Sequence, residues 1–299
     1  MTTQNPTGWD IPKRYLRVCI NRISPDNKRD RTLIYQLTED MRVKFNTVAA
    51  CSGALTECNC VITGLDVATM FTISTSATQW MKNWFQHEIV IDAGFYGNFS
   101  ILFRGTIINA TASLDNADYT LTIKAMSGFG AATTPLSYSI EGKVPVSHIV
   151  HVWADHFNLG FVDGLHDDTI KIENFQIQEQ NLTTAMRQIS QMVPVDVYES
   201  NGQLIIKRVM EPAKGASLLN ITSDMLVGAP QPTDTGCKVK VLMRHGCQTA
   251  QPVKLYSKKY PKFESTDFYI QTIAHSGDTF GSDWFTELEL VKVGLRYYK

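Results

Sequence analysis

The stretch YTLTIKA, residues 119–125, decides the fold class of this 299-residue chain. Its apolar side chains occupy every second position, at Tyr119, Leu121, Ile123 and Ala125. The positions between them carry Thr120, Thr122 and Lys124. Because successive residues of a β-strand point to opposite faces, this period of two predicts a strand with one buried and one exposed face.

The same period recurs from residue 12 to residue 130. Met41, Val43 and Phe45 alternate with polar residues, and further strand-like runs are YLRVCI, EIVIDAG and ILFRGTII. Turn-forming clusters such as SPDNKRD and LDNAD separate these runs, which is typical of an antiparallel barrel or sandwich. A short helix is expected at 78–86, where the large apolar residues have helical spacing: Trp80, Met81, Trp84 and Phe85.

The period changes after a predicted connection at 125–142. One helical face is formed by Ile149, Val152, Trp153, His156 and Phe157. Ser147 is a candidate N-cap of this helix and Gly160 a candidate stop. A second helix is expected at 182–193, followed by a β-hairpin whose turn is Asn201-Gly202. Residues 143–210 therefore read as a small α+β module.

Strand-like runs return from residue 216 onward, as CKVKVLMR, VKLYS, FYIQTIA and ELELVKV. The predicted fold class is mainly β with an α+β insert: two antiparallel β-barrel or sandwich domains that flank the module. The predicted boundaries are 1–140 for the first β domain with its short helix, 141–215 for the α+β module and 216–299 for the second β domain.

Composition restricts the function classes. The net charge of −1 provides no basic field that would recruit nucleic acid or a membrane surface. No apolar run approaches the roughly 20 residues that span a bilayer, and the opening MTTQNPTGWD does not resemble a secretory signal. The six cysteines are expected to be reduced, and the C-x6-C-x-C cluster at Cys51, Cys58 and Cys60 lacks the spacing of a zinc knuckle.

The most polar stretch is HSGDTFGSDWFTEL, residues 275–288. His275, Asp278 and Asp283 are conceivable metal ligands. The stretch lies between two strand-like runs, however, and its glycines and aspartates are the residues that tight turns use. We expect a structural hairpin connection rather than a metal site.

Three histidines, His148, His151 and His156, fall on the first predicted helix. Their spacing differs from the HExxH pattern of zinc proteases. His151 and Asp155 are expected to form a surface pair, and His156 lies on the apolar stripe, which predicts a core or interface position.

Other charged clusters are expected to be solvated loops. These are Asp163 with His166-Asp167-Asp168, Lys28-Arg29-Asp30-Arg31, and Lys258-Lys259 with Tyr260. The chain has no G-x-S-x-G motif and no P-loop. The sequence therefore predicts no catalytic residue, no cofactor and no metal ligand.

An ordered set of segments resembles the baseplate hub proteins of contractile-tailed bacteriophages. The C-terminal segments are ITSDMLVGAPQPTDTGCKVKVLMR (221–244), VKLYS (253–257) and FYIQTIAHSGDTFGSDWFTELELVKV (268–293). The earlier segments are CNCVITGLDVATM (58–70), LFRGTIINATASLDNADYTLTIKAMSGF (102–129) and NLTTAMRQISQMVPVDVYESNGQLIIKR (181–208). The run HGCQTAQPVKLYS lacks the Pro-Gly pair that this family usually carries before VKLYS, so the turn there is expected to differ.

The resemblance implies a non-enzymatic homotrimer in the virion, at the tail baseplate, assembled in the host cytoplasm. Each subunit would contribute two tube-like β domains, so that three subunits present six similar units to the tail tube protein. The opposite face would seat the trimeric central spike protein, with the tape-measure and baseplate wedge proteins as further partners. Specific nucleic-acid binding and membrane insertion are not expected.

Three alternatives stay open. One is a tail-associated cell-wall hydrolase. Another is a carbohydrate-binding receptor protein that uses exposed aromatics, for which Trp9, Tyr260 and Tyr269 are candidates, although core packing suits them better. The third is the hub of a related contractile injection machine.

Overall fold

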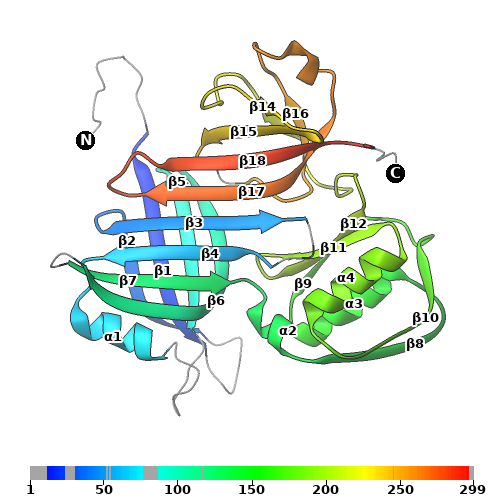
Figure 1. Ribbon diagram of the computed structural model, residues 1–299, viewed down its shortest axis with the longest axis horizontal. Helices are drawn as coiled ribbons and strands as arrows, with labels where there is room; N and C mark the ends of the chain where they lie inside the picture. Colours follow the sequence, from blue (N-terminus) through cyan, green and yellow to red (C-terminus); the bar gives the residue numbers. More distant parts are fainter. Residues whose placement is uncertain are drawn as a thin grey trace.

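The computed structural model describes residues 12–23, 31–51, 53, 55–76, 87–115, 118–244 and 246–295. These residues form a large β-sheet with a compact module of helices and short strands beside one end of it (Figure 1). We refer to residues 12–126 as the N-terminal β region, 129–208 as the α/β module and 219–292 as the C-terminal β region.

The described part of the N-terminal β region holds seven strands and one helix. The strands are β1 (Arg14–Ile23), β2 (Arg31–Thr38), β3 (Arg42–Ala50), β4 (Glu57–Thr63), β5 (His87–Phe95), β6 (Asn98–Asp115) and β7 (Asp118–Met126). The helix is α1 (Val67–Ser76). The helix predicted at 78–86 lies outside the described residues.

Two layers of this region enclose the first hydrophobic core. β3, β4 and β7 form one layer, and β1, β2 and β5 cross steeply behind it (Figure 1). The long strand β6 belongs to both layers, because Asn98–Thr106 pairs with β5 and Thr106–Asp115 pairs with β7. The period of two predicted from YTLTIKA is confirmed, since Leu121 and Ile123 are buried between the layers.

The C-terminal β region adds six strands to the same sheet. They are β13 (Leu219–Ile221), β14 (Gln231–Pro232), β15 (Gly236–Leu242), β16 (Pro252–Leu255), β17 (Phe268–Asp278) and β18 (Trp284–Lys292), with a short 3₁₀ helix, η1, at Pro261–Phe263. The strand order is β14-β15-β18-β17-β3-β4-β7-β6-β5-β1-β2; off this path, β16 pairs with β17, and β13 pairs with β16.

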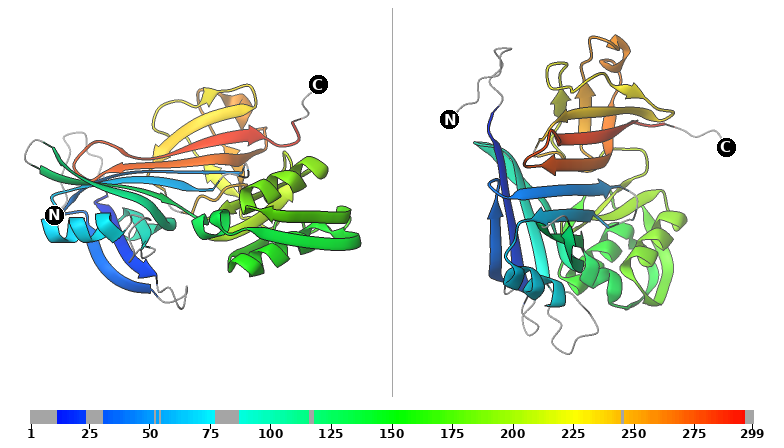
Figure 2. Two further views of the ribbon diagram at one scale, coloured as in Figure 1. Left: turned by 60° about the horizontal axis from the view of Figure 1, so that its bottom comes forward. Right: turned by 60° about the vertical axis from the view of Figure 1, so that its left-hand side comes forward.

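The fold is mainly β, as expected, but the described strands close no barrel. A single 13-stranded sheet runs through both regions, because β17 pairs with β3. Both views of Figure 2 show β17 and β18 continuing the surface of β3 and β4. Sequence periodicity could not reveal this junction, since it identifies a strand without identifying its neighbour.

The α/β module has its own core. Its elements are α2 (Phe129–Thr133), β8 (Leu136–Pro145), α3 (Val146–Phe157), β9 (Gly160–Asp163), β10 (Lys171–Gln180), α4 (Leu182–Met192), β11 (Val195–Ser200) and β12 (Gln203–Arg208). The connection predicted at 125–142 is wrong, because this range holds the end of β7, all of α2 and part of β8. Within β8, Leu136, Tyr138 and Ile140 point toward the module core at strand spacing.

Helix α3 begins and ends differently from the prediction. Pro145 occupies the N-cap position in place of Ser147, which is a buried residue of the first turn. The helix ends at Asn158, not Gly160: Asn158 has a φ of 54°, and asparagine tolerates this left-handed conformation. The second helix and the hairpin are confirmed, as α4 and as the turn at Asn201 (φ 49°) and Gly202 (φ 85°).

The helices are short. Helix α3 has 12 residues and α4 has 11, below the roughly 20 that a bilayer requires. Within the described part of the chain, no helix has the length and apolar character of a membrane span.

His275 is a buried residue of β17, with 6% of its surface exposed. Its Nδ1 lies 2.9 Å from the Thr286 Oγ1 atom on the neighbouring strand β18. Burial lowers the pKa of His275 to about 4, so the folded protein holds this ring neutral near neutral pH. The ring is thus a polar core group.

We predict that the free energy of unfolding falls as the pH drops from about 6.5 toward 4. In this range His275 binds a proton in the unfolded chain but stays neutral in the folded protein, so protonation favours the unfolded state. His275→Gln should remove up to about 3 kcal/mol of this pH dependence. Burial also lowers the pKa of His87 to about 4, so this residue should account for part of the pH dependence that remains in the variant. Urea unfolding across this pH range measures the effect.

The matched control is His148→Gln, at an exposed position on α3. Parallel stability-versus-pH profiles for wild type and His275→Gln would contradict the assignment.

Candidate assembly surface

The main candidate surface is the side of the central sheet that faces away from the hydrophobic cores. We call it the open face. It is formed by alternate residues of β15, β18, β17, β3, β4, β7 and the second half of β6. Representative residues are Lys238, Lys240, Glu287, Glu289, Thr272, Ala274, Lys44, Asn46, Asn59 and Lys124.

The open face crosses the junction between the two β regions without interruption. Residues paired directly across neighbouring antiparallel strands project to the same side. One such row of partners is Ser276, Asn46, Asn59, Lys124 and Asn109. The row runs from β17 to β6 and is polar throughout, so both regions contribute to one continuous polar wall.

Charges on the open face are mixed in sign. Lys240 lies 3.3 Å from Glu287 on the adjacent strand, and Lys44 lies 3.2 Å from Asp278. Surface pairs of this kind each stabilise by about 0–1 kcal/mol. The face therefore has no strong field of one sign that would attract a polyanion.

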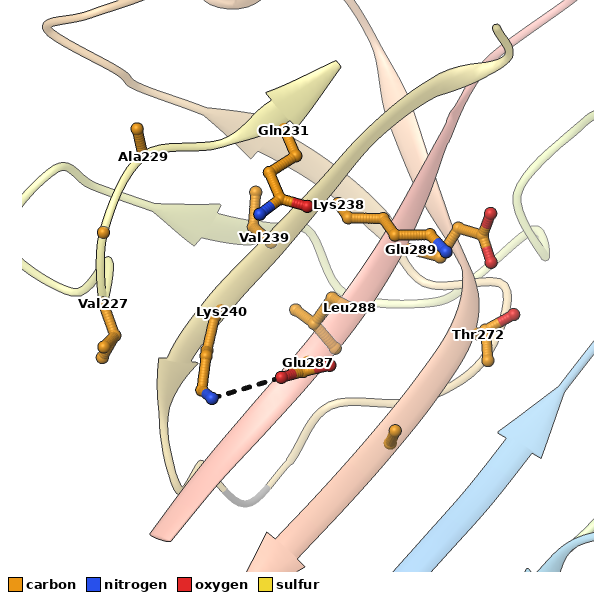
Figure 3. A pocket seen from close by; sticks show the side chains of 12 residues that line it. Val227, Ala229, Gln231, Lys238, Val239, Lys240, Thr272, Glu287, Leu288 and Glu289 are labelled. Carbon is orange, nitrogen blue, oxygen red and sulfur yellow. Dashed lines mark ion pairs between the residues drawn. The ribbon is translucent and has the colours of Figure 1, made fainter. Parts of the chain in front are cut away.

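A shallow hollow of about 310 Å³ lies where residues 227–231 arch over this face (Figure 3). Lys238, Lys240, Glu287 and Glu289 project into view on its floor. Apolar residues such as Val227, Val239 and Leu288 line the hollow together with these charged residues, and Lys240 is already paired with Glu287. Among the described residues, no group of three or more His, Cys, Asp or Glu side chains is arranged to hold a metal ion.

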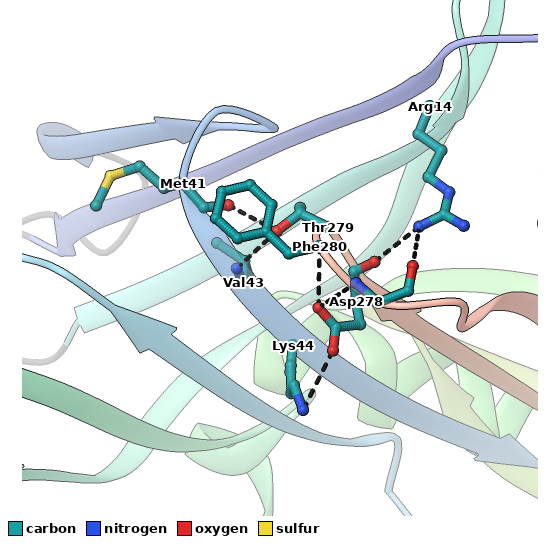
Figure 4. A network of polar contacts seen from close by, with 8 residues as sticks. Arg14, Met41, Val43, Lys44, Asp278, Thr279 and Phe280 are labelled. Atoms are coloured by element: carbon teal, nitrogen blue, oxygen red, sulfur yellow. Dashed lines mark hydrogen bonds and ion pairs between the residues drawn. The ribbon is translucent and has the colours of Figure 1, made fainter. Parts of the chain in front are cut away.

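The segment 275–288 lies at the junction of the regions. Asp278 ends β17, and its Oδ1 accepts hydrogen bonds from the backbone N–H groups of Phe280 and Gly281, both at 3.0 Å (Figure 4). Arg14 donates to the carbonyl oxygens of Asp278 (2.9 Å) and Gly281 (2.7 Å). Partial burial would raise the pKa of the Asp278 carboxyl, but hydrogen bonds from Lys44 and the turn lower it.

Thr279 extends the same network to the start of β3. Its hydroxyl donates to the Met41 carbonyl oxygen at 2.7 Å and accepts from the Val43 N–H at 2.9 Å (Figure 4). The predicted structural turn is thus confirmed, with β17 continuing to Asp278 before the turn begins. The conceivable metal ligands His275 and Asp278 are occupied by protein partners instead.

Trp284, the first residue of β18 in the C-terminal β region, packs in the hydrophobic core of the N-terminal β region. Its side chain is 2% exposed and belongs to the first core cluster. Its indole Nε1–H donates to the Gly94 carbonyl oxygen at 2.9 Å, and its ring meets Phe45 edge-on at 5.8 Å. Burial of this large ring fixes how the two regions lie against each other.

The β11–β12 hairpin attaches the α/β module to both β regions. Buried Glu199 accepts hydrogen bonds from the Ser127 hydroxyl and the Gly202 N–H, each at 2.6 Å. Burial raises the pKa of this carboxyl. Fully buried Lys207 pairs with Asp196 at 2.6 Å and lies over the Tyr269 ring at 4.8 Å. Glu199 thus contacts Ser127, which directly follows β7, and Lys207 contacts Tyr269 of β17, so the module is held where the two β regions meet.

The other candidate residues do not form a catalytic site. His148 and His151 are exposed on α3, and His151 Nε2 lies 3.8 Å from Asp155 Oδ2, as the predicted surface pair requires. Of the two positions expected for His156, core or interface, the core position is wrong and the interface position stays a prediction. His156 is exposed because the buried stripe of α3 instead passes through Val150 and Ala154.

The acidic residues at 163–168 organise their own loop. Asp163 accepts hydrogen bonds from the N–H groups of Leu165 and His166. Hydrogen bonds from Thr169 and then Arg208 lower the pKa of the Asp167 carboxyl. These carboxylates stabilise a loop next to β12 and do not converge on a shared ligand.

The clustered cysteines are buried and free. Cys58 and Cys60 face the first core, and burial raises the pKa of Cys60 to about 12, which keeps its thiol protonated. Cys51 packs with Tyr198 in a separate cluster. Sequence reasoning predicted this structural role.

The remaining candidates divide in a similar way. Tyr269 is a core residue and Tyr260 is half-buried, whereas Trp9 and Lys28-Arg29-Asp30 lie outside the described residues. Arg31, the last residue of that patch, begins β2 and pairs with Glu88 at 2.8 Å. Lys258 and Lys259 are exposed. Sequence reasoning missed the open face, because its small polar residues have meaning only once the strand order is known.

We predict that Asp278→Ala lowers the free energy of unfolding by about 1–3 kcal/mol, because two partly buried N–H groups lose their acceptor. Urea unfolding measures the loss. The control is Glu287→Ala on the same face, which removes only the exposed pair with Lys240 and should cost below about 1 kcal/mol. Equal losses in the two variants would show that the Asp278 network does not hold the junction.

The fold has solved relatives. The 43 kDa tail protein of prophage MuSo2 from Shewanella oneidensis matches with a TM-score of 0.61 at 10% identity, covering 92% of this chain and 98% of that one. The tail protein from Neisseria meningitidis MC58 matches with a TM-score of 0.58 at 10% identity, covering 93% and 97%. These likenesses show that the fold is that of phage tail proteins.

A third structure comes from a secretion machine. It is the E. coli c3393 protein, described as a component of the type VI secretion system with structural similarity to the T4 tail proteins gp27 and gp5. The TM-score is 0.56 at 9% identity, with 86% of this chain and 74% of that chain covered. A search of curated proteins found no match.

The family comparison covers most of the sequence. The model of the family described as baseplate hub gp41 matches residues 16–287, which include the α/β module and most of both β regions. This family is one of structural baseplate proteins. The chain belongs to the baseplate hub gp41 family and is a hub protein of the phage tail baseplate.

Proposed function

We propose that three copies of this chain form a ring that joins the six-fold tail tube to the trimeric central spike. The observation that carries this proposal is an internal repeat in the sheet. The strand order β3-β4-β7-β6 in the N-terminal β region is matched by β14-β15-β18-β17 in the C-terminal one. Three chains with two similar units each can satisfy a partner with six-fold symmetry.

The strand registers support this repeat. Asn46, Asn59, Lys124 and Asn109 are successive cross-strand partners in the first set. Gln231, Lys238, Glu289 and Thr272 are successive partners in the second. Each long strand also carries an irregularity at the same place, between Ile107 and Asn109 in β6 and between Ile270 and Thr272 in β17.

The open face would then line the passage through the ring. Because its side chains are polar and of mixed charge, the passage would expose little apolar surface to which a chain moving through it could bind. Such a passage would suit the tape-measure protein as a transient occupant. The tube would lie on one side of the ring and the spike on the other. Wedge proteins would contact the outside.

The solved relatives add support for a spike partner. One is a chain of the PdpA–VgrG complex from Francisella, with a TM-score of 0.58 at 10% identity, covering 96% of this chain and 60% of that one. The protein would act without catalysis and would be assembled in the host cytoplasm before joining the virion. A cell-wall hydrolase or a glycan receptor is not favoured by any described group of side chains.

The test is the native mass of the purified chain, alone and mixed with its spike protein, with negative-stain images of the same samples. We predict a trimeric ring, either alone or after the spike is added. A monomer that ignores the spike and forms no ring would overturn the proposal. A zymogram on cell walls is the companion measurement, and clearing by the purified chain would overturn the non-enzymatic role.

A further inference from the structure

The two units of the internal repeat differ at one strand edge: β17 pairs with β3 there, whereas no described strand lies beside the matching edge of β6. After its irregularity, β17 pairs with β3 along seven residues, from Thr272 to Asp278. This edge lies on the side of β17 opposite β18, next to β16. It forms the junction between the two β regions.

The matching edge of β6 has no strand beside it in the described structure. β5 accompanies β6 only as far as Thr106, and β7 occupies the other side. From Asn109 to Asp115 the strand therefore pairs on one side only. The nearby helix α1 contacts β6 through the core cluster, to which Met70 and Ile73 belong.

Most of this edge lacks the usual protection against pairing, and its single charged residue is Asp115 at the end of the strand. Exposed edge strands in monomeric proteins are commonly protected by charged residues, prolines or irregular geometry. Residues 109–113 read NATAS, with no charge and no proline, and they lie beyond the irregularity. Such an edge is suited to accept another strand.

We infer that the edge of β6 from residue 109 to residue 115 pairs with the β14 segment, residues 229–233, of a second copy of this chain. The inference rests on the proposed ring. Within one chain, β17 pairs with β3. Since β6 corresponds to β17 and β14 corresponds to β3, the joint between chains repeats the joint within a chain.

The repeat also fixes the register of the new joint. Within the chain, Ser276 of β17 lies opposite Asn46 of β3. The cross-strand partners make Ser113 the counterpart of Ser276, and Gln231 the counterpart of Asn46. Ser113 of one copy therefore lies opposite Gln231 of the next. Both side chains are exposed in the single chain, as an unformed joint requires.

The β14 segment, residues 229–233, can form only a short hydrogen-bonded ladder with β6 of another copy. Pro230 and Pro232 have no N–H to donate, so they limit the length of any ladder along this edge. β14 has only two residues, whereas β3 has nine. We expect fewer main-chain hydrogen bonds between chains than within one, which would let subunits fold first and join afterwards.

The experiment is a disulfide cross-link in the full chain carrying Ser113→Cys and Gln231→Cys. Directly opposed strand residues lie within the Cα separation that a disulfide spans. After assembly and mild oxidation with Cu(II)–phenanthroline, a denaturing gel without reductant should shift the main band from one chain to two and three chains. Thr111→Cys with Thr233→Cys keeps the same register and should give the same shift.

Three controls accompany it. Asn46→Cys with Ser276→Cys tests the internal joint and should close within one chain. Asn109→Cys with Gln231→Cys is out of register by about 13 Å and should not cross-link. Wild type, treated identically, measures the background from the six native cysteines.

Native mass separates the two ways of failing. A trimer whose subunits fail to cross-link at either in-register pair, while the internal control closes, would overturn this joint and leave the proposed ring standing. A chain that stays monomeric with its spike present would overturn the proposed ring and this joint together. A trimer that cross-links only in register supports both.

Discussion

Main-chain pairing between β3 and β17 joins residues from opposite ends of the chain, and the remaining architecture depends on it. Without this ladder the two β regions would be separate bodies connected through the α/β module. With it, the strands from β14 to β2 form one continuous hydrogen-bonded sheet. Trp284 adds a large buried contact beside the ladder, so that the C-terminal region completes the core of the N-terminal one.

The α/β module reinforces this junction with buried polar groups. Glu199 and Lys207 are almost fully buried, and burying such charges is unfavourable unless each has close partners. Ser127 and Gly202 supply partners for Glu199, and Asp196 supplies one for Lys207. An apolar contact would tolerate small displacements of the module, whereas these hydrogen bonds require one position. The hairpin is therefore suited to fixing the angle between the β regions in a symmetric assembly.

A surface for assembly differs from a catalytic centre in the residues it requires. Catalysis needs a few titratable groups brought together, and the described histidines, aspartates and cysteines are instead dispersed, engaged in loops or buried in cores. Assembly needs a rigid sheet, a repeated unit and an accessible edge. The chain has each of these, and the most polar stretch of its sequence contributes rigidity by linking Arg14, Lys44 and Asp278 at the junction.

The sequence by itself determined the strands, the module and their order along the chain. The alternation in YTLTIKA, the amphipathic helix at 182–193 and the Asn201-Gly202 turn are local signals, because each depends on the geometry of a few adjacent residues. The ordered motifs also indicated the hub family. Helix ends were less predictable, since Pro145 and Asn158 cap α3. Ser147 and Gly160 were expected at these two positions.

Only the tertiary structure decided which strands are neighbours. Strand pairing is a contact between distant residues, and a half-buried strand has the same pattern whichever strand lies beside it. The β17–β3 junction, the open face and the edge of β6 that no described strand covers all follow from that choice of neighbours. Small polar residues such as Asn46, Asn59 and Ser113 carry no signal on their own, and they acquire a role because the sheet brings them into one surface.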